Sequence, residues 1–338
     1  MTMMFPIPKF HLSVFTDEER RELIPLMSDK ERRRMSKFVL VEHEQFEDTI
    51  EFIRERLHFA SNYPEPHDDD HREIQAEGWI GGVIGAPRTG KSFIAQYYTS
   101  LHPPVFKQNG GWKVPVAYIE ARSDWDRKEF AKQIYWQTKA TALPRLTIAS
   151  MNSTVTSRLR DMGVRLLIID DAQFLFDTTY AKAHTHKSML HHIANAMQCN
   201  ILLVGTEEVE NAIYAEDRLR GRGDFPSPDV LVGFDPKDPD GRIDFREFLA
   251  EIEKRLPFQA VSDLNRRDWI DDFFEACGGS RGRAMNYIVA AAYAAITDRS
   301  PCIQLHHLQQ AAKDRTPSGK AMIPFVGRRK KKENGNGL

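Results

Sequence analysis

The sequence has few cysteines, no long apolar run and almost no net charge. Its three cysteines, Cys199, Cys277 and Cys302, lie far apart and form neither a CxxC pair nor a zinc-ligand spacing, which argues against a disulfide framework and fits a reducing compartment. The most apolar late stretch, residues 287–296, is too short to span a bilayer. The first residues lack the order of a signal peptide. We therefore expect a cytoplasmic protein with no membrane partner.

The near-zero net charge excludes a histone-like polycation but no other class of nucleic-acid-binding protein. Lys and Arg number 47 against 48 Asp and Glu, a net charge of −1, so the chain is not a histone-like polycation. Local basic patches decide DNA binding more than totals do. Hydrophobic residues make up 41% of the 338 residues, which is enough for a sizeable core, and the length suits two domains.

The order of predicted elements favours an α/β domain followed by a smaller helical domain. Strands alternating with helices are typical of a parallel sheet with helices on both faces, whereas the pattern from Asp244 onward is purely helical. Capping boxes beginning at Thr16 and Ser28 predict two short helices near the N-terminus. The predicted strands cover residues 79–84, 114–119, 165–170, 201–205 and 230–234, and the helices between them cover 91–100, 126–138 and 187–198.

These patterns divide the chain into four predicted segments. They are an N-terminal arm (1–37), an α/β domain (38–236), a small helical domain (237–315) and a flexible basic tail (316–338).

The segment GAPRTGKS, residues 85–92, matches the pattern GxxxxGK[ST]. It follows an apolar strand and opens a helix, as a phosphate-binding loop requires. Backbone N–H groups and the helix N-terminus would face the phosphates, Lys91 would neutralise the β and γ phosphates, and Ser92 would ligate Mg²⁺. The predicted ATP-binding residues of this loop are Gly85, Ala86, Pro87, Arg88, Thr89, Gly90, Lys91, Ser92 and Phe93.

The segment RLLIIDD, residues 165–171, predicts the acidic partner of this loop. A hydrophobic strand that ends in carboxylates places them at the carboxyl edge of the sheet, beside the metal. We expect Asp170 to hold Mg²⁺, through water, and Asp171 to polarise the attacking water. ATP and Mg²⁺ are therefore the predicted cofactors, with Ser92 and Asp170 as the metal site.

Over most of residues 38–290 the chain resembles AAA+ ATPases of the TnsC/TniB type, which regulate DNA transposition. The Walker motifs alone specify only a P-loop NTPase, and the later segments narrow the resemblance. It implies an AAA+ α/β fold with a helical lid. The matching segments are GAPRTGKS, LLIIDDAQFL, NILLVGTEEVENAI, EDRLRGRGDF and FREFLAEIEKRLPFQAVSDL.

The resemblance implies further roles for single residues. Thr206 corresponds to sensor 1, which reads the γ-phosphate. Arg222 corresponds to the arginine finger that reaches a neighbouring subunit's ATP, with Arg218 and Arg220 as close competitors. Sensor 2 is either Arg281 or Arg283, and the sequence leaves this choice open.

One position departs from the family pattern. AAA+ proteins usually have Glu where this chain has Asp171. The shorter side chain holds its carboxylate farther from the catalytic water. We therefore expect a slow ATPase that serves as an assembly switch.

The resemblance also implies partners. It implies ATP-dependent assembly into a homo-oligomeric ring or helical filament on double-stranded DNA, recruitment or activation of a transposase, and a target-selection factor such as a TniQ-type protein. The expected DNA contacts, which are equally compatible with ordinary surface charge, are Arg122, Arg127, Lys128 and Arg145. In the tail, RRKKK is either a solvated end or a DNA-binding extension, and the island 322–326 is either a docking peptide for a transposase or a random segment.

Two other functions are compatible with the same motifs, and two further patterns resemble metal sites. A helicase-loader-like motor or a signalling NTPase without a DNA role would share the same nucleotide site. Residues 236–247 follow part of an EF-hand pattern, but the first ligand position is Pro236, so we expect a turn that leads into a capped helix. The histidines at 184, 186, 191 and 192 lack a fixed ligand spacing.

Overall fold

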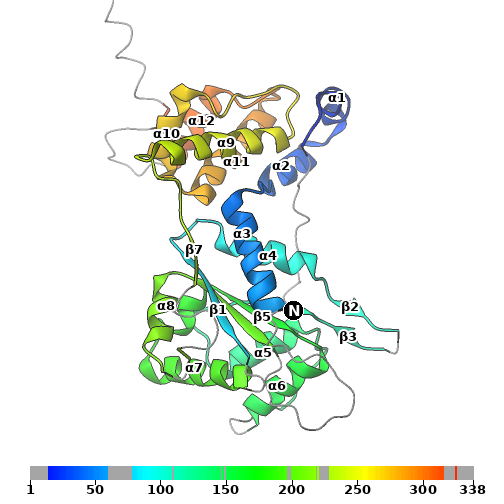
Figure 1. Ribbon diagram of the computed structural model, residues 1–338. Helices are drawn as coiled ribbons and strands as arrows, with labels where there is room; N and C mark the ends of the chain where they lie inside the picture. Colours follow the sequence, from blue (N-terminus) through cyan, green and yellow to red (C-terminus); the bar gives the residue numbers. More distant parts are fainter. Residues whose placement is uncertain are drawn as a thin grey trace, which may run out of the picture. The chain divides into compact units, whose positions relative to one another are not determined.

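The computed structural model describes residues 14–59, 78–108, 110–145, 147, 150–195, 199–217, 219–220, 228–315 and 324–325. The chain forms two compact units (Figure 1). The α/β unit comprises Glu44–Leu231, and the helical unit combines the described residues of Met1–His43 and Val232–Leu338. Residues 14–43 are thus part of the helical unit, whereas we expected residues 14–37 in an arm and residues 38–43 in the α/β domain.

The α/β unit is built on one parallel sheet. Its strand order is β4-β5-β6-β1-β7, and every neighbouring pair is parallel. The first four predicted strands form within two residues of their expected bounds, and the fifth is shorter than expected. The strands are β1 (Ile80–Gly85), β4 (Val116–Glu120), β5 (Leu166–Asp170), β6 (Asn200–Gly205) and β7 (Asp229–Leu231).

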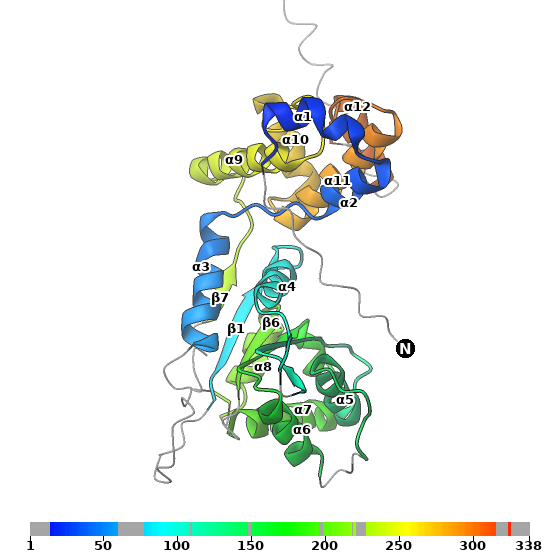
Figure 2. The same ribbon diagram turned by 90° about the vertical axis from the view of Figure 1, so that its right-hand side faces the viewer.

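Helices cover both faces of this sheet, as predicted. Figure 2 shows α5, α6 and α7 together on one side of the strands and α3 on the other. The larger core lies on the first side, where Phe130, Leu159 and Ile193 are fully buried against strand residues. The helical segments are α3 (Glu44–Ile53), the π-helix η2 (Arg54–His58), α4 (Lys91–Leu101), α5 (Arg127–Gln137), α6 (Met151–Asp161), the 3-10 helix η3 (Ala172–Leu175), α7 (Tyr180–Asn195) and α8 (Glu207–Tyr214).

A small hairpin was not predicted. β2 (Val105–Phe106) and β3 (Trp112–Lys113) form a separate two-stranded antiparallel sheet between α4 and β4. Both strands have only two residues, which is too short for a period-2 pattern to be visible in the sequence.

The helical unit has its own core, in which Phe245, Phe273, Ile288 and Leu308 are fully buried. Both predicted capping boxes are present, at Thr16 and at Ser28 of the N-terminal segment. Its elements are α1 (Asp17–Glu22), the 3-10 helix η1 (Ile24–Leu26), α2 (Asp29–Lys37), α9 (Pro239–Arg255), α10 (Arg267–Cys277), α11 (Arg281–Thr297) and α12 (Leu305–Arg315).

The EF-hand-like stretch is a capped helix start, as expected. The Asp238 carboxylate accepts a hydrogen bond from the Asp240 amide, and α9 begins at Pro239. The residues that would form most of a calcium loop are therefore helical. In the described parts of the chain, no helix is long and apolar enough to cross a membrane.

Arg20 ties the N-terminal segment to the end of α9. Its side chain is buried, and its two terminal nitrogens donate to four backbone carbonyls, those of Glu253, Lys254, Leu256 and Phe258. The last carbonyls of a helix have no partner within the helix and carry its negative dipole end. A guanidinium is well matched to them because it is always charged and holds several donors in one plane.

Candidate nucleotide-binding site

The predicted phosphate-binding loop connects the end of β1 to the start of α4. A Cβ atom on Gly85 would lie 2.3 Å from the Leu231 carbonyl oxygen, so the approach of β7 requires glycine there. Gly90 has φ +112°, a conformation that glycine adopts without strain. The loop therefore delivers Lys91 to the first turn of α4, where a helix N-terminus favours phosphate.

Lys91 is folded back on its own loop. Its Nζ donates to the carbonyl oxygens of Gly85 and Ala86, at 2.7 Å each. Burial lowers the pKa of Lys91, and Asp170 and Asp171 oppose that shift. The ammonium thus has two backbone oxygens of its own loop as partners.

Asp170 lies at the end of β5 and is only 2% exposed. Its Oδ1 accepts hydrogen bonds from Ser92 Oγ at 3.1 Å and from the Asp171 amide at 2.9 Å. Its Oδ2 accepts one from Tyr118 Oη at 2.6 Å. Burial raises the pKa of Asp170, and the hydrogen bonds from Tyr118 and Ser92 oppose this by stabilising the carboxylate.

The carboxyl ends of three neighbouring strands bring the predicted residues to one edge of the sheet. β6 lies between β5 and β1, so Thr206 follows the strand beside the one that leads to the P-loop, and Asp171 follows the next strand along. Asp171 has φ +50°, and Gln173 Nε2 donates to its Oδ1 at 3.2 Å. Thr206 donates its hydroxyl to the Glu208 carboxylate.

The donor set at this edge suits magnesium. The Ser92 hydroxyl and the Asp170 carboxylate supply hard oxygen ligands, which Mg²⁺ prefers, and they already lie within hydrogen-bonding distance of each other. Few protein ligands are expected, because Mg²⁺ keeps several waters and uses substrate phosphates. The residues present therefore fit the predicted ion.

None of the three candidates for the arginine finger is placed at this site in the described part of the chain. Arg222 and Arg218 lie outside the described residues. Arg220 is exposed and pairs with Asp217 at 2.5 Å. The role of the arginine finger stays a prediction.

Both sensor 2 candidates lie on α11 of the helical unit. Arg281 donates to the Val232 carbonyl at 2.6 Å and stacks over the Phe234 ring, and burial lowers its pKa to about 10. Arg283 is exposed. Arg281 is thus engaged within its own unit, and the choice between the two stays a prediction.

The four predicted DNA contacts differ in exposure. Arg122, Lys128 and Arg145 are exposed. Arg127 is half-buried and donates to the Asn152 side chain at 2.5 Å, which ties the start of α5 to α6. The first three are therefore more available to a DNA backbone than Arg127.

Sequence reasoning missed two side chains next to the site. Tyr118 on β4 donates to Asp170, and Gln96 on α4 donates to Tyr118 at 3.1 Å. Neither residue belongs to a motif, and only the pairing of β4 with β5 brings Tyr118 to Asp170. No local sequence signal reveals such a contact.

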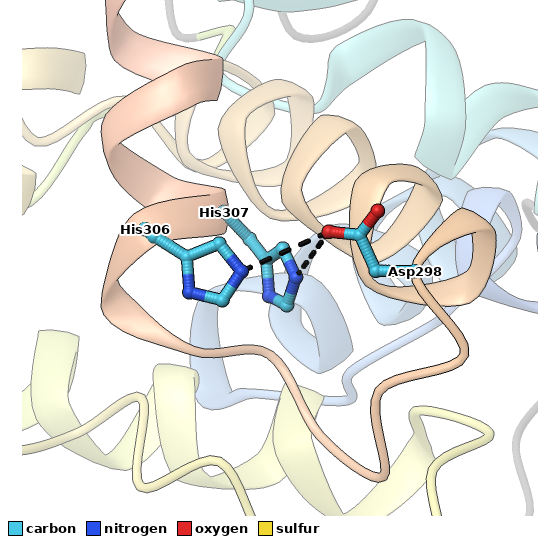
Figure 3. A group of neighbouring side chains, drawn as sticks. All are labelled: Asp298, His306 and His307. Carbon is cyan, nitrogen blue, oxygen red and sulfur yellow. Dashed lines mark hydrogen bonds and ion pairs between the residues drawn. The ribbon is translucent and has the colours of Figure 1, made fainter.

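A group of possible metal ligands occurs in the helical unit (Figure 3). Asp298 Oδ2 lies 3.2 Å from His307 Nε2 and 3.7 Å from His306 Nε2. However, His307 Nδ1 accepts a hydrogen bond from the Gln304 amide. A neutral imidazole that accepts at Nδ1 carries its proton on Nε2, so His307 donates to Asp298 and has no lone pair for a metal. The group closes the turn between α11 and α12.

The predicted histidine cluster lies on α7, and two of its members differ in burial. His186 is buried, its Nδ1 lies 2.9 Å from the Leu175 carbonyl oxygen, and its ring packs edge-on against Phe130. His184 is exposed. His186 therefore belongs to the core of the α/β unit.

The P-loop after β1, the acids at the end of β5 one strand away, and this strand order together form the fold of P-loop ATPases of the AAA+ class. Residues 79–225 match the family model of the bacterial TniB protein. This match covers less than half of the chain and lies within the α/β unit, so it shows a similarity of that unit to the TniB family. The matched region contains the Walker A and Walker B segments and Thr206.

Solved structures with a similar fold are distant in sequence. Drosophila ORC bound to DNA has a TM-score of 0.50 and 15% identity, and the match covers 87% of this chain and 67% of that chain. The ORC1 protein of Aeropyrum pernix in complex with DNA has a TM-score of 0.49 and 14% identity, with 81% and 66% covered. The Walker-type ATPase of Pyrococcus abyssi has a TM-score of 0.42 and 17% identity, with 65% of each chain covered.

These similarities describe the fold alone. This chain spans 65% of the Pyrococcus abyssi ATPase and 60% of the Cdc6 protein of Pyrobaculum aerophilum. No curated protein matches the chain.

Proposed function

We propose that this protein is an ATP-dependent regulator of DNA transposition. It binds ATP with Mg²⁺, assembles as a ring or helical filament on double-stranded DNA, and recruits or activates a transposase there. Slow hydrolysis then disassembles it. The observation that carries this proposal is the convergence of Lys91, Ser92 and Asp170 at one sheet edge, within the region that matches the TniB family.

The roles of the residues follow from their positions. Lys91 exchanges its two loop carbonyls for the β and γ phosphates, and the loop N–H groups hold the same oxygens. Ser92 and Asp170 hold Mg²⁺, which neutralises charge on the phosphates. Asp171, oriented by Gln173, accepts a hydrogen bond from the attacking water. Thr206 contacts the γ-phosphate.

Oligomer formation would complete the site. Arg222 of one protomer reaches the γ-phosphate held by its neighbour, so that ATP stabilises the contact between them. Arg281 or Arg283 supplies a further cation from the helical unit. Arg122, Lys128 and Arg145 contact DNA phosphates, and assembly multiplies this small charge along the duplex. A TniQ-type factor is the proposed target selector.

The test compares wild-type protein, Lys91→Ala and the control Lys182→Ala, which removes an exposed lysine of α7. Each is mixed with duplex DNA and ATP, a non-hydrolysable analogue or no nucleotide, then sedimented and imaged. We expect nucleotide-dependent rings or filaments from wild-type and Lys182→Ala, and none from Lys91→Ala. Rapid turnover without stable assemblies would instead indicate a motor or loader. No effect of DNA would indicate a signalling NTPase.

A further inference from the structure

Strand register places Tyr118 beside the predicted magnesium carboxylate. Glu120 of β4 pairs with Asp170 of β5. Side chains two residues apart on a strand share a face, so Tyr118 lies on the same face as Glu120, diagonally across from Asp170. Its hydroxyl reaches Asp170 Oδ2 at 2.6 Å.

The direction of each hydrogen bond is fixed by chemistry. An ionised carboxylate only accepts, so the Tyr118 proton points to Asp170. The Tyr118 oxygen then accepts from Gln96 Nε2 at 3.1 Å. Gln96 lies one turn after Ser92 on α4, and residues four apart share a helix face. α4 therefore supplies both the hydroxyl that bonds Asp170 Oδ1 and the amide that bonds Tyr118.

We propose that Tyr118, supported by Gln96, is a positioning residue for Asp170 that sets the affinity of the site for divalent metal. This inference rests on the proposed function. A metal ion would use a lone pair of the Ser92 oxygen, whereas the bond to Asp170 uses the Ser92 proton, so Ser92 would serve both. The Tyr118 hydroxyl and the Asp171 amide do not ligate the metal, and they act only as donors that hold the carboxylate in its orientation.

The test measures binding of a fluorescent, non-hydrolysable ATP analogue to the full-length chain over a series of Mg²⁺ concentrations and in EDTA. For Tyr118→Phe, we expect the half-saturating Mg²⁺ concentration to rise about tenfold, because a hydrogen bond to a charged group is lost. Binding in EDTA should be unchanged. A merely structural role would weaken binding in both conditions. The matched control is Tyr135→Phe, which removes a buried-ring hydroxyl bonded to the Thr154 carbonyl, away from Asp170.

A second variant keeps the inference testable if Tyr118→Phe does not fold. Gln96→Met removes the donor that supports the Tyr118 oxygen and should raise the half-saturating Mg²⁺ concentration about twofold to threefold. If Tyr118→Phe folds and its Mg²⁺ dependence is unchanged, the inference is overturned. If Tyr118→Phe does not fold, an unchanged Mg²⁺ dependence in Gln96→Met overturns it. Failure of wild-type protein to bind the analogue at all would overturn the proposed function instead.

Discussion

Replacing Arg20 by methionine should destabilise the helical unit by about 3 kcal/mol. Methionine keeps much of the aliphatic volume but removes all four hydrogen bonds to the end of α9. Three of the four acceptors keep a backbone donor, and the fourth, the Phe258 carbonyl oxygen, is bonded by Arg20 at 2.6 Å. A hydrogen bond from a charged group contributes roughly 1.5–3 kcal/mol. Water that enters the space recovers part of the four lost bonds, which leaves a net loss of about 3 kcal/mol.

The assay is native-state hydrogen exchange, because it resolves the two units separately. A loss of about 3 kcal/mol corresponds to a fall of about a hundredfold in amide protection, which we expect in α9 and α11 but not in β5 or β6. Arg21→Met is the matched control, since Arg21 is exposed on the same helix. A fall of less than about fivefold, or an equal fall in the control, would refute the reasoning.

Two further results are expected. Asp171→Ala should still bind ATP but hydrolyse it about a hundredfold more slowly and form longer-lived DNA assemblies; loss of nucleotide binding would mean that the wrong acid was assigned. Burial lowers the pKa of both His43 and His58 to about 4. The folded state therefore binds fewer protons, so the urea midpoint should fall as the pH drops from about 6.5 to 4, and His58→Gln should reduce this dependence.

Sequence patterns predicted the elements whose signals are local. Apolar runs marked β1, β5 and β6, and the capping boxes at Thr16 and Ser28 formed as expected. The P-loop and the paired acids could be located because their function requires fixed spacings and a strand or helix on each side.

The contacts that escaped prediction join distant parts of the chain. Arg20 bonds the Phe258 carbonyl across 238 positions, and Tyr118 reaches Asp170 across 52. Such contacts depend on the strand order and on the packing of segments within one unit, neither of which leaves a periodic trace in the sequence. The four predicted segments therefore placed residues 14–37 in an arm, whereas Arg20 and the two short helices pack into the helical unit.

Because the helical unit is assembled from both ends of the chain, its parts leave the ribosome at very different times. The segment that carries Arg20 emerges first, yet the carbonyls it bonds follow only after the whole of Glu44–Leu231 has been translated. The α/β unit can therefore fold while the early segment still lacks its partners, since domains tend to fold as they emerge. The packing of α1 and α2 into the helical unit therefore has to wait for the helices that follow the α/β unit in the sequence.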